Sequence, residues 1–125
     1  MYNLLSNVCK CKLKILKSND LANEKRVQEM LKSSDILYVC EGDTLEMLTL
    51  WKKYHFDERL KEQYEQGKML SGTSAGALCW FHSFTSEREG LLRVGNGLNF
   101  MNGYLTCHGQ NRHLAEFHKE QLKNK

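Results

Sequence analysis

Residues 72–76 read Gly-Thr-Ser-Ala-Gly, so that a serine stands between two small residues and two glycines. A serine hydroxyl is a poor nucleophile until a base removes its proton, and a sharp turn from a strand into a helix exposes such a hydroxyl. Ser74 is therefore the candidate nucleophile of a hydrolase, and the amide of Ala75 would point to where an oxyanion forms. The alternative is a plain tight turn in which the serine only caps the helix.

A serine nucleophile also needs an imidazole and usually a carboxylate. One histidine, His108, ends a predicted strand. It is therefore expected at the edge of the sheet, as Ser74 is, and it is the candidate base. The other histidines fit surface or helical positions: His55, His82, His113 and His118. The turn at residues 72–76 is called the elbow below. The candidate carboxylates are Glu87 and Glu89 in the segment after it, and the sequence does not choose between them.

The composition narrows the class of protein. Of the 125 residues, 41% are hydrophobic and 26% are charged, which is typical of a globular protein, and the net charge is only +3. The lysines are scattered, whereas nucleic-acid binding needs a concentrated basic surface. The sequence has no apolar run long enough to predict a membrane span. Its N-terminus is too short and too polar for a signal peptide. We therefore expect a cytoplasmic protein that binds neither membrane nor nucleic acid.

The five cysteines form no CxxC pair, so we expect reduced thiols, no metal site and no cofactor. Their number is odd, and the only close pair is Cys9 and Cys11. The spacing of this pair suits one face of a strand better than a zinc knuckle. The sequence leaves the oligomeric state open.

Strand and helix patterns alternate along the chain. Hydrophobic periodicity predicts strands at residues 9–16, 35–40, 69–72 and 104–108, the second of them buried on both faces. It predicts helices at residues 21–32, from 44 onward, at 57–66, from 75 to 81 and from 112 to 125, with residues 82–103 irregular. The fold class is therefore α/β, an open, mostly parallel sheet with flanking helices.

Sites in open parallel sheets lie beyond the carboxyl ends of the strands. Three segments with polar or catalytic residue types follow predicted strand ends, namely residues 41–43, 73–75 and 108–110. Their positions alone indicate one shared site.

These segments resemble the peptidase E family of aspartyl dipeptidases, which is related to cyanophycinase and has the class I glutamine amidotransferase-like fold. Residues 41–44, Glu-Gly-Asp-Thr, resemble its Gly-Gly-Gly-Asn-Thr turn, and residues 72–77 match its elbow. Residues 106–108 with 117–119 resemble its Cys-Pro-His segment and the following helix. The chain departs from the pattern at Cys40 and Glu41, and it has no proline.

The resemblance implies a serine peptidase that removes an N-terminal aspartate from a dipeptide or short peptide. It assigns Ser74 as nucleophile, His108 as base and Glu87 or Glu89 as the acidic member. It places the oxyanion hole at the amides of Ala75 and of the turn that contains Gly42. An aspartyl side chain needs a cation, for which Arg112 is the candidate.

The resemblance covers about residues 8–125, and it implies a single domain over residues 1–125. Family members are longer. We therefore expect an incomplete domain that lacks N-terminal and C-terminal parts of the family fold. Two alternatives remain beside the peptidase. One is a truncated, inactive domain that keeps the elbow, and the other is an amidotransferase-like acyl transferase, which normally carries a cysteine where this chain has Ser74.

Overall fold

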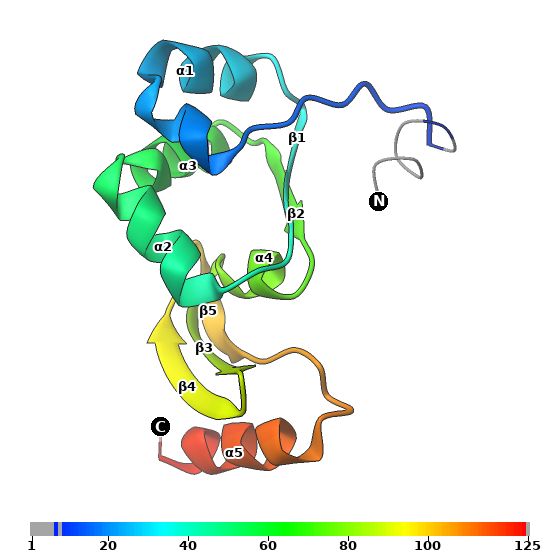
Figure 1. Cartoon of the computed structure of the whole chain (residues 1–125), viewed down its shortest axis with the longest axis vertical. Helices are drawn as coiled ribbons and strands as arrows, with labels where there is room; N and C mark the ends of the chain where they lie inside the picture. Colours follow the sequence, from blue (N-terminus) through cyan, green and yellow to red (C-terminus); the bar gives the residue numbers. More distant parts are fainter. Residues whose placement is uncertain (1–6, 8, 125) are drawn as a thin grey trace. The chain divides into compact units, whose positions relative to one another are not determined.

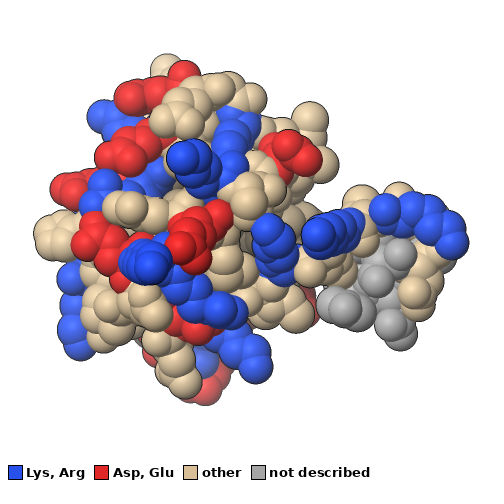
Figure 2. Space-filling model, turned by 90° about the horizontal axis from the view of Figure 1, so that it is seen from above, with Lys and Arg blue, Asp and Glu red and all other residues tan. Residues whose placement is uncertain are grey.

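The computed structural model describes residue 7 and residues 9–124, and it divides the chain into two compact units, Met1–Ser34 and Asp35–Lys125 (Figure 1). Among the described residues, no helix is long and apolar enough to cross a membrane. Figure 2 shows acidic and basic side chains interspersed over the face that it draws, which agrees with the scattered lysines of the sequence.

The first unit contains a 3₁₀ helix, Ser18–Ala22, and helix α1, Glu24–Lys32, which contact each other. Asn23 caps α1 because its side chain accepts a hydrogen bond from the amide of Arg26 at 3.1 Å. Val27 and Leu31 of α1 are buried, one helical turn apart. The predicted helix at residues 21–32 is thus confirmed.

The predicted strand at residues 9–16 is wrong. These residues have no regular secondary structure and most of them are exposed. Their alternating pattern suits a strand, but a strand forms only by hydrogen bonding to a neighbour, and no described strand pairs with this segment.

The second unit begins with a two-stranded parallel sheet of β1, Ile36–Val39, and β2, Met69–Gly72. The strands pair from Ile36 with Met69 to Val39 with Gly72, so their carboxyl ends lie at the same edge. Helices α2, Thr44–Lys53, and α3, Phe56–Glu65, connect them. The expectation that the first of these strands is buried on both faces is wrong, since Ile36 is 54% exposed.

A three-stranded sheet follows, in which β3, Phe81–Arg88, lies between β4, Leu91–Asn96, and β5, Met101–Leu105. The β3–β4 pair is an antiparallel hairpin and the β3–β5 pair is parallel. The expectation of an irregular segment at residues 82–103 is wrong. Its strand is hard to see in the sequence because residues 83–86 are all buried although three of them are Ser or Thr.

Two further helices complete this unit. Helix α4, Ala75–Leu78, follows the elbow and is shorter than predicted, and α5, Arg112–Lys123, contacts β3. The buried core is apolar and largely aromatic, with Leu48, Trp51, Phe56, Leu60, Leu78, Trp80, Phe84 and Leu114. The fold is therefore α/β with parallel and mixed sheets flanked by helices, as predicted, and it is consistent with a class I glutamine amidotransferase-like fold.

Candidate active site

Ser74 occupies a strained turn between β2 and α4. Its φ of 52° and ψ of −116° lie in a backbone region that L residues rarely adopt. The side chain makes no capping hydrogen bond to α4 although Ser74 is the residue before the helix. This excludes the interpretation of Ser74 as an ordinary capping serine, and its hydroxyl is available for other contacts.

The two glycines of the elbow allow three backbone segments to meet. A Cβ on Gly76 would lie 2.6 Å from the carbonyl carbon of Val39 and closer still to its oxygen. A Cβ on Gly72 would lie 2.8 Å from the same oxygen and would also collide with the backbone of Gly76. Since these obstacles are backbone atoms, no side chain can move aside, and the Gly-x-Ser-x-Gly spacing is a steric requirement.

The hydroxyl of Ser74 lies 2.9 Å from Nε2 of His108. His108 follows the end of β5 and itself has a positive φ of 55°. Its carbonyl accepts the amide of Asn111 at 2.8 Å, and the Asn111 side chain caps α5 through the amide of Leu114. The loop that carries the imidazole is therefore fixed to the start of a helix.

Cys107 also reaches the serine, with its Sγ 3.7 Å from Ser74 Oγ. The preceding residue, Thr106, donates a hydrogen bond from its hydroxyl to the carbonyl of Thr85 at 3.2 Å. This bond ties the loop to β3, so both neighbours of the serine hydroxyl come from one anchored segment.

Two amides near the serine are free to receive an oxyanion. Neither the amide of Ala75 nor that of Gly42 donates a hydrogen bond to any described residue. Both residues line the same pocket as Ser74. They come from the ends of β2 and β1, whose parallel pairing brings the two turns together.

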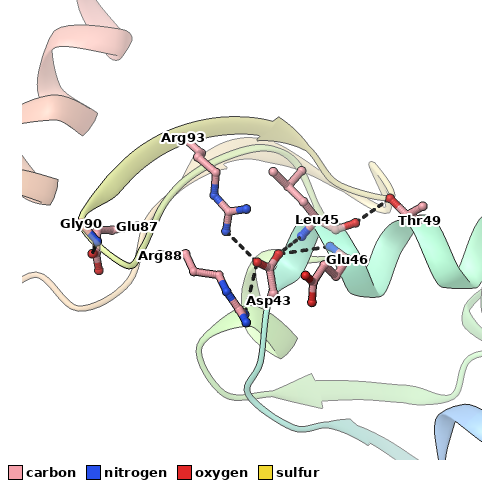
Figure 3. A network of polar contacts seen from close by, with 8 residues as sticks. All are labelled: Asp43, Leu45, Glu46, Thr49, Glu87, Arg88, Gly90 and Arg93. Atoms are coloured by element: carbon pink, nitrogen blue, oxygen red, sulfur yellow. Dashed lines mark hydrogen bonds and ion pairs between the residues drawn. The ribbon is translucent and has the colours of Figure 1, made fainter.

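The carboxylate of Asp43 joins two elements beside these amides (Figure 3). Its Oδ1 accepts the amides of Leu45 at 3.0 Å and Glu46 at 3.1 Å, which caps α2. Its Oδ2 pairs with Arg93 at 3.1 Å and with Arg88 at 3.2 Å. Burial alone would raise the pKa of Asp43, but the amide of Glu46, the hydrogen bond from Arg93 and the charges of both arginines together lower it.

These groups surround a pocket of about 250 Å³. Its lining comes from the turn after β1, the elbow, the β3–β4 hairpin and the start of α5: Gly42, Asp43, Thr44, Ser74, Ala75, Leu78, Ser86, Glu87, Arg88, Arg93, Cys107, His108, Asn111 and Leu114. Among the described residues, no group of three or more His, Cys, Asp or Glu side chains could hold a metal ion.

The two candidate carboxylates occupy different positions. Glu87 lines the pocket, and its Oε1 accepts a hydrogen bond from the amide of Gly90. Glu89 stands at the exposed tip of the hairpin with a positive φ of 52°, outside the pocket lining. Within the described part of the chain, no hydrogen bond or ion pair joins either carboxylate to His108.

Arg112 lies outside the pocket, with a side chain that is 88% exposed and paired with Glu116 at 3.3 Å. The pocket arginines are instead Arg88 and Arg93, which the sequence reasoning missed. Recognition of the hairpin would have found them. In a two-residue hairpin with Arg88 opposite Leu91 and Ser86 opposite Arg93, residues 86, 88 and 93 share one face.

His118 does not sit on the solvated surface that we expected for it. Its Nδ1 lies 2.7 Å from the hydroxyl of buried Thr85, and its ring centroid lies 5.0 Å from that of Tyr104. Burial lowers the pKa of His118. His55 is exposed, as expected, with its Nδ1 3.6 Å from Glu58.

Two comparisons with known proteins found a match to this chain. A family model described as "Peptidase family S51" matches residues 1–124. The chain is also 36% identical, over 74 residues, to a Bacillus subtilis (strain 168) protein named "Uncharacterized peptidase YgaJ". Those residues are 59% of this chain and 32% of that relative, so the matched part spans about a third of the relative's length.

Proposed function

The chain belongs to peptidase family S51, and from this premise we propose that it hydrolyses peptide bonds with Ser74 as the nucleophile and His108 as the general base. The observation that carries the proposal is the 2.9 Å separation between Ser74 Oγ and His108 Nε2. Ser74 stands at a strand-to-helix elbow whose close backbone packing requires both glycines. Hydrogen-bond reach between nucleophile and base is the first geometric condition for this chemistry.

In the proposed reaction, Ser74 Oγ attacks the scissile carbonyl carbon while His108 Nε2 takes the hydroxyl proton. The carbonyl oxygen becomes an oxyanion that accepts hydrogen bonds from the free amides of Ala75 and Gly42. The C–N bond then breaks, the imidazolium gives its proton to the leaving amine, and an acyl-enzyme ester remains. Water attacks this ester with His108 again as base, which releases the acid and restores Ser74.

We take Glu87 as the acidic partner of this pair, since it lines the pocket and Glu89 does not. A carboxylate there stabilises the imidazolium of His108 electrostatically as it forms. Because no described carboxylate hydrogen-bonds the imidazole, the contribution of Glu87 acts through the charge of the pocket and is smaller than that of a bonded triad member.

For the substrate we propose a dipeptide or short peptide with an N-terminal aspartate. Two arginines and one aspartate meet beside Ser74, so this Asp43 cluster has one excess positive charge, which Glu87 balances over the pocket lining as a whole. Arg88 is 46% exposed and contacts Asp43 through one nitrogen, which leaves the rest of its guanidinium for a substrate carboxylate. Arg88 therefore replaces Arg112 as the proposed anchor.

A second candidate is a folded domain of the same family without activity. The observation that favours it is the coverage of the relative, because the aligned part corresponds to 32% of that protein. In this case the elbow geometry persists while residues needed for turnover are supplied elsewhere in longer relatives.

Labelling with a fluorophosphonate probe decides between the two. We expect the wild-type chain to form one covalent adduct, located on Ser74 by peptide mass spectrometry, and to hydrolyse Asp-Ala. Ser74→Ala should abolish both. Ser71→Ala is the matched control, because its hydroxyl donates to the carbonyl of Leu37 and does not line the pocket. A sample that is folded by circular dichroism but forms no adduct would favour the inactive domain.

A further inference from the structure

The carboxylate of Asp43 makes more contacts than a helix cap needs. One oxygen, Oδ1, already satisfies the first amides of α2. The other, Oδ2, is held by two guanidinium groups that come from the end of β3 and from β4. The side chain is only 3% exposed, so these contacts lie in a largely desolvated site where charge pairing is strong.

The turn directly before Asp43 is packed at its start, where the backbone of Val39 and Cys40 lies against Gly76. Neither Glu41 nor Gly42 makes a backbone hydrogen bond to a described residue outside the regular strands and helices. A Cβ at Gly42 would meet nothing within 4 Å, so no neighbouring group packs against Gly42 on that side. The orientation of the Gly42 amide therefore depends on the residue that follows it.

We propose that Asp43 is a positioning residue, which Arg93 holds in place so that the amide of Gly42 points at the developing oxyanion. This inference rests on the proposed function, since it assigns a task to the same pocket. Arg93 is the stronger of the two links because its side chain is 21% exposed, whereas that of Arg88 is 46% exposed and is screened by solvent. Figure 3 shows Arg93 reaching Asp43, which lies 50 residues earlier in the chain. Through this contact the β3–β4 hairpin sets the geometry of the turn before Asp43.

The charge of Asp43 is part of this arrangement. A neutral amide at this position could still accept from the amides of α2, but it would leave the Arg93 guanidinium without its carboxylate partner. The other titratable or charged side chains that line the pocket are Glu87, Arg88, Cys107 and His108. With its lowered pKa, Asp43 keeps its negative charge throughout the neutral range.

The test compares the full-length chain with Asp43→Asn, using fluorophosphonate labelling and hydrolysis of Asp-Ala. A mispositioned oxyanion donor should lower kcat less than a deleted donor does. We therefore expect kcat and the labelling rate to fall by about tenfold while KM stays within about twofold. A defect in substrate binding would instead raise KM. Asp20→Asn is the matched control, because Asp20 also accepts a backbone amide, from Lys17, pairs with Arg26 at 3.2 Å, and does not line the pocket.

A second pair of variants keeps the test decisive if Asp43→Asn does not fold. Arg93→Met leaves the cap of α2 intact and removes the main link, and Arg93→Lys restores a positive charge. We expect Arg93→Met to lower kcat and the labelling rate by about tenfold while KM stays within about twofold, because Asp43 loses the guanidinium that holds it. Arg93→Lys should recover part of both effects.

The outcomes separate the two proposals. A wild-type chain that is folded but reacts with no probe overturns the proposed function and this inference with it. A reactive wild-type chain with folded Asp43→Asn or Arg93→Met variants that react equally fast overturns only the positioning role. A rise in KM at constant kcat also overturns it, because the cluster would then act in substrate binding.

Discussion

Gly76 packs directly on the carbonyl group of Val39, so that a Cβ on Gly76 would meet the carbon of that group at 2.6 Å. We expect Gly76→Ala to lower the free energy of unfolding by at least about 2 kcal/mol, since backbone atoms cannot relax around the added methyl group. Urea unfolding followed by circular dichroism measures this change. Gly109→Ala is the control, because a Cβ there would meet nothing within 4 Å and its φ is not positive. Equal stability of both variants would contradict the steric account of the elbow.

The two glutamates of the hairpin should differ in their effect on catalysis. Glu87→Gln keeps an acceptor for the amide of Gly90 but removes the charge that lines the pocket, so we expect kcat to fall by about threefold to tenfold. Glu89→Gln changes the same chemical group at the hairpin tip and should leave kcat within about twofold of wild type. Hydrolysis of Asp-Ala measures both. A larger loss with Glu89→Gln would reverse the assignment.

The arginine that recognises an acidic substrate can be identified by comparing Asp-Ala with the neutral, nearly isosteric Asn-Ala. We expect Arg88→Met to raise KM for Asp-Ala by about tenfold and to change KM for Asn-Ala little, because one charge-assisted hydrogen bond is lost. Arg112→Met should affect neither substrate, since this side chain is 88% exposed and lies outside the pocket lining. Equal effects of Arg88→Met on the two peptides would remove Arg88 from a role in specificity.

The burial of His118 predicts a pH dependence of stability. Burial lowers its pKa in the folded chain, whereas the unfolded chain titrates near the ordinary value of 6.5. The unfolded state therefore binds the proton first as the pH falls. The contribution of neutral His118 to stability is complete above the unfolded pKa and is lost as the pH falls from there through the folded pKa.

We therefore expect the free energy of unfolding to decrease between about pH 7.5 and about pH 5, and His118→Gln to make this slope shallower. Glutamine can still accept from the hydroxyl of Thr85, so the slope rather than the absolute stability is the readout. His113→Gln, on the exposed side of the same helix, should leave the slope unchanged. Identical slopes in wild type and His118→Gln would show that His118 does not titrate differently in the two states.

The elements around Ser74 could be predicted because their signals are local. The apolar runs of β1 and β2 and the glycines around Ser74 each indicate their own conformation without reference to distant residues. The serine-histidine contact followed from these elements, since the carboxyl ends of strands converge. The cap that Asp43 forms on α2 is a local feature of the same kind, since it depends on its nearest neighbours alone.

The parts that failed depend on distant partners. Residues 9–16 have the alternation of a strand but lack a described strand to pair with. The middle of β3 carries Ser83, Thr85 and Ser86 in buried positions, where a hydrophobicity pattern predicts exposure. Since the hairpin was missed, Arg88 and Arg93 could not be placed on one face, and the pocket charge was assigned to Arg112 instead.

The thiol of Cys107, 3.7 Å from the hydroxyl of Ser74, has a consequence for how the mechanism is diagnosed with inhibitors. An alkyl group attached to Cys107 would fill the space in front of the nucleophile, so iodoacetamide would block a reaction in which no cysteine takes part. Inhibition by a thiol reagent would then be misread as evidence for a cysteine peptidase, although the modified Cys107 is not the proposed nucleophile. Only the site of the acyl or phosphonyl adduct, and not the reagent that prevents it, identifies the nucleophile.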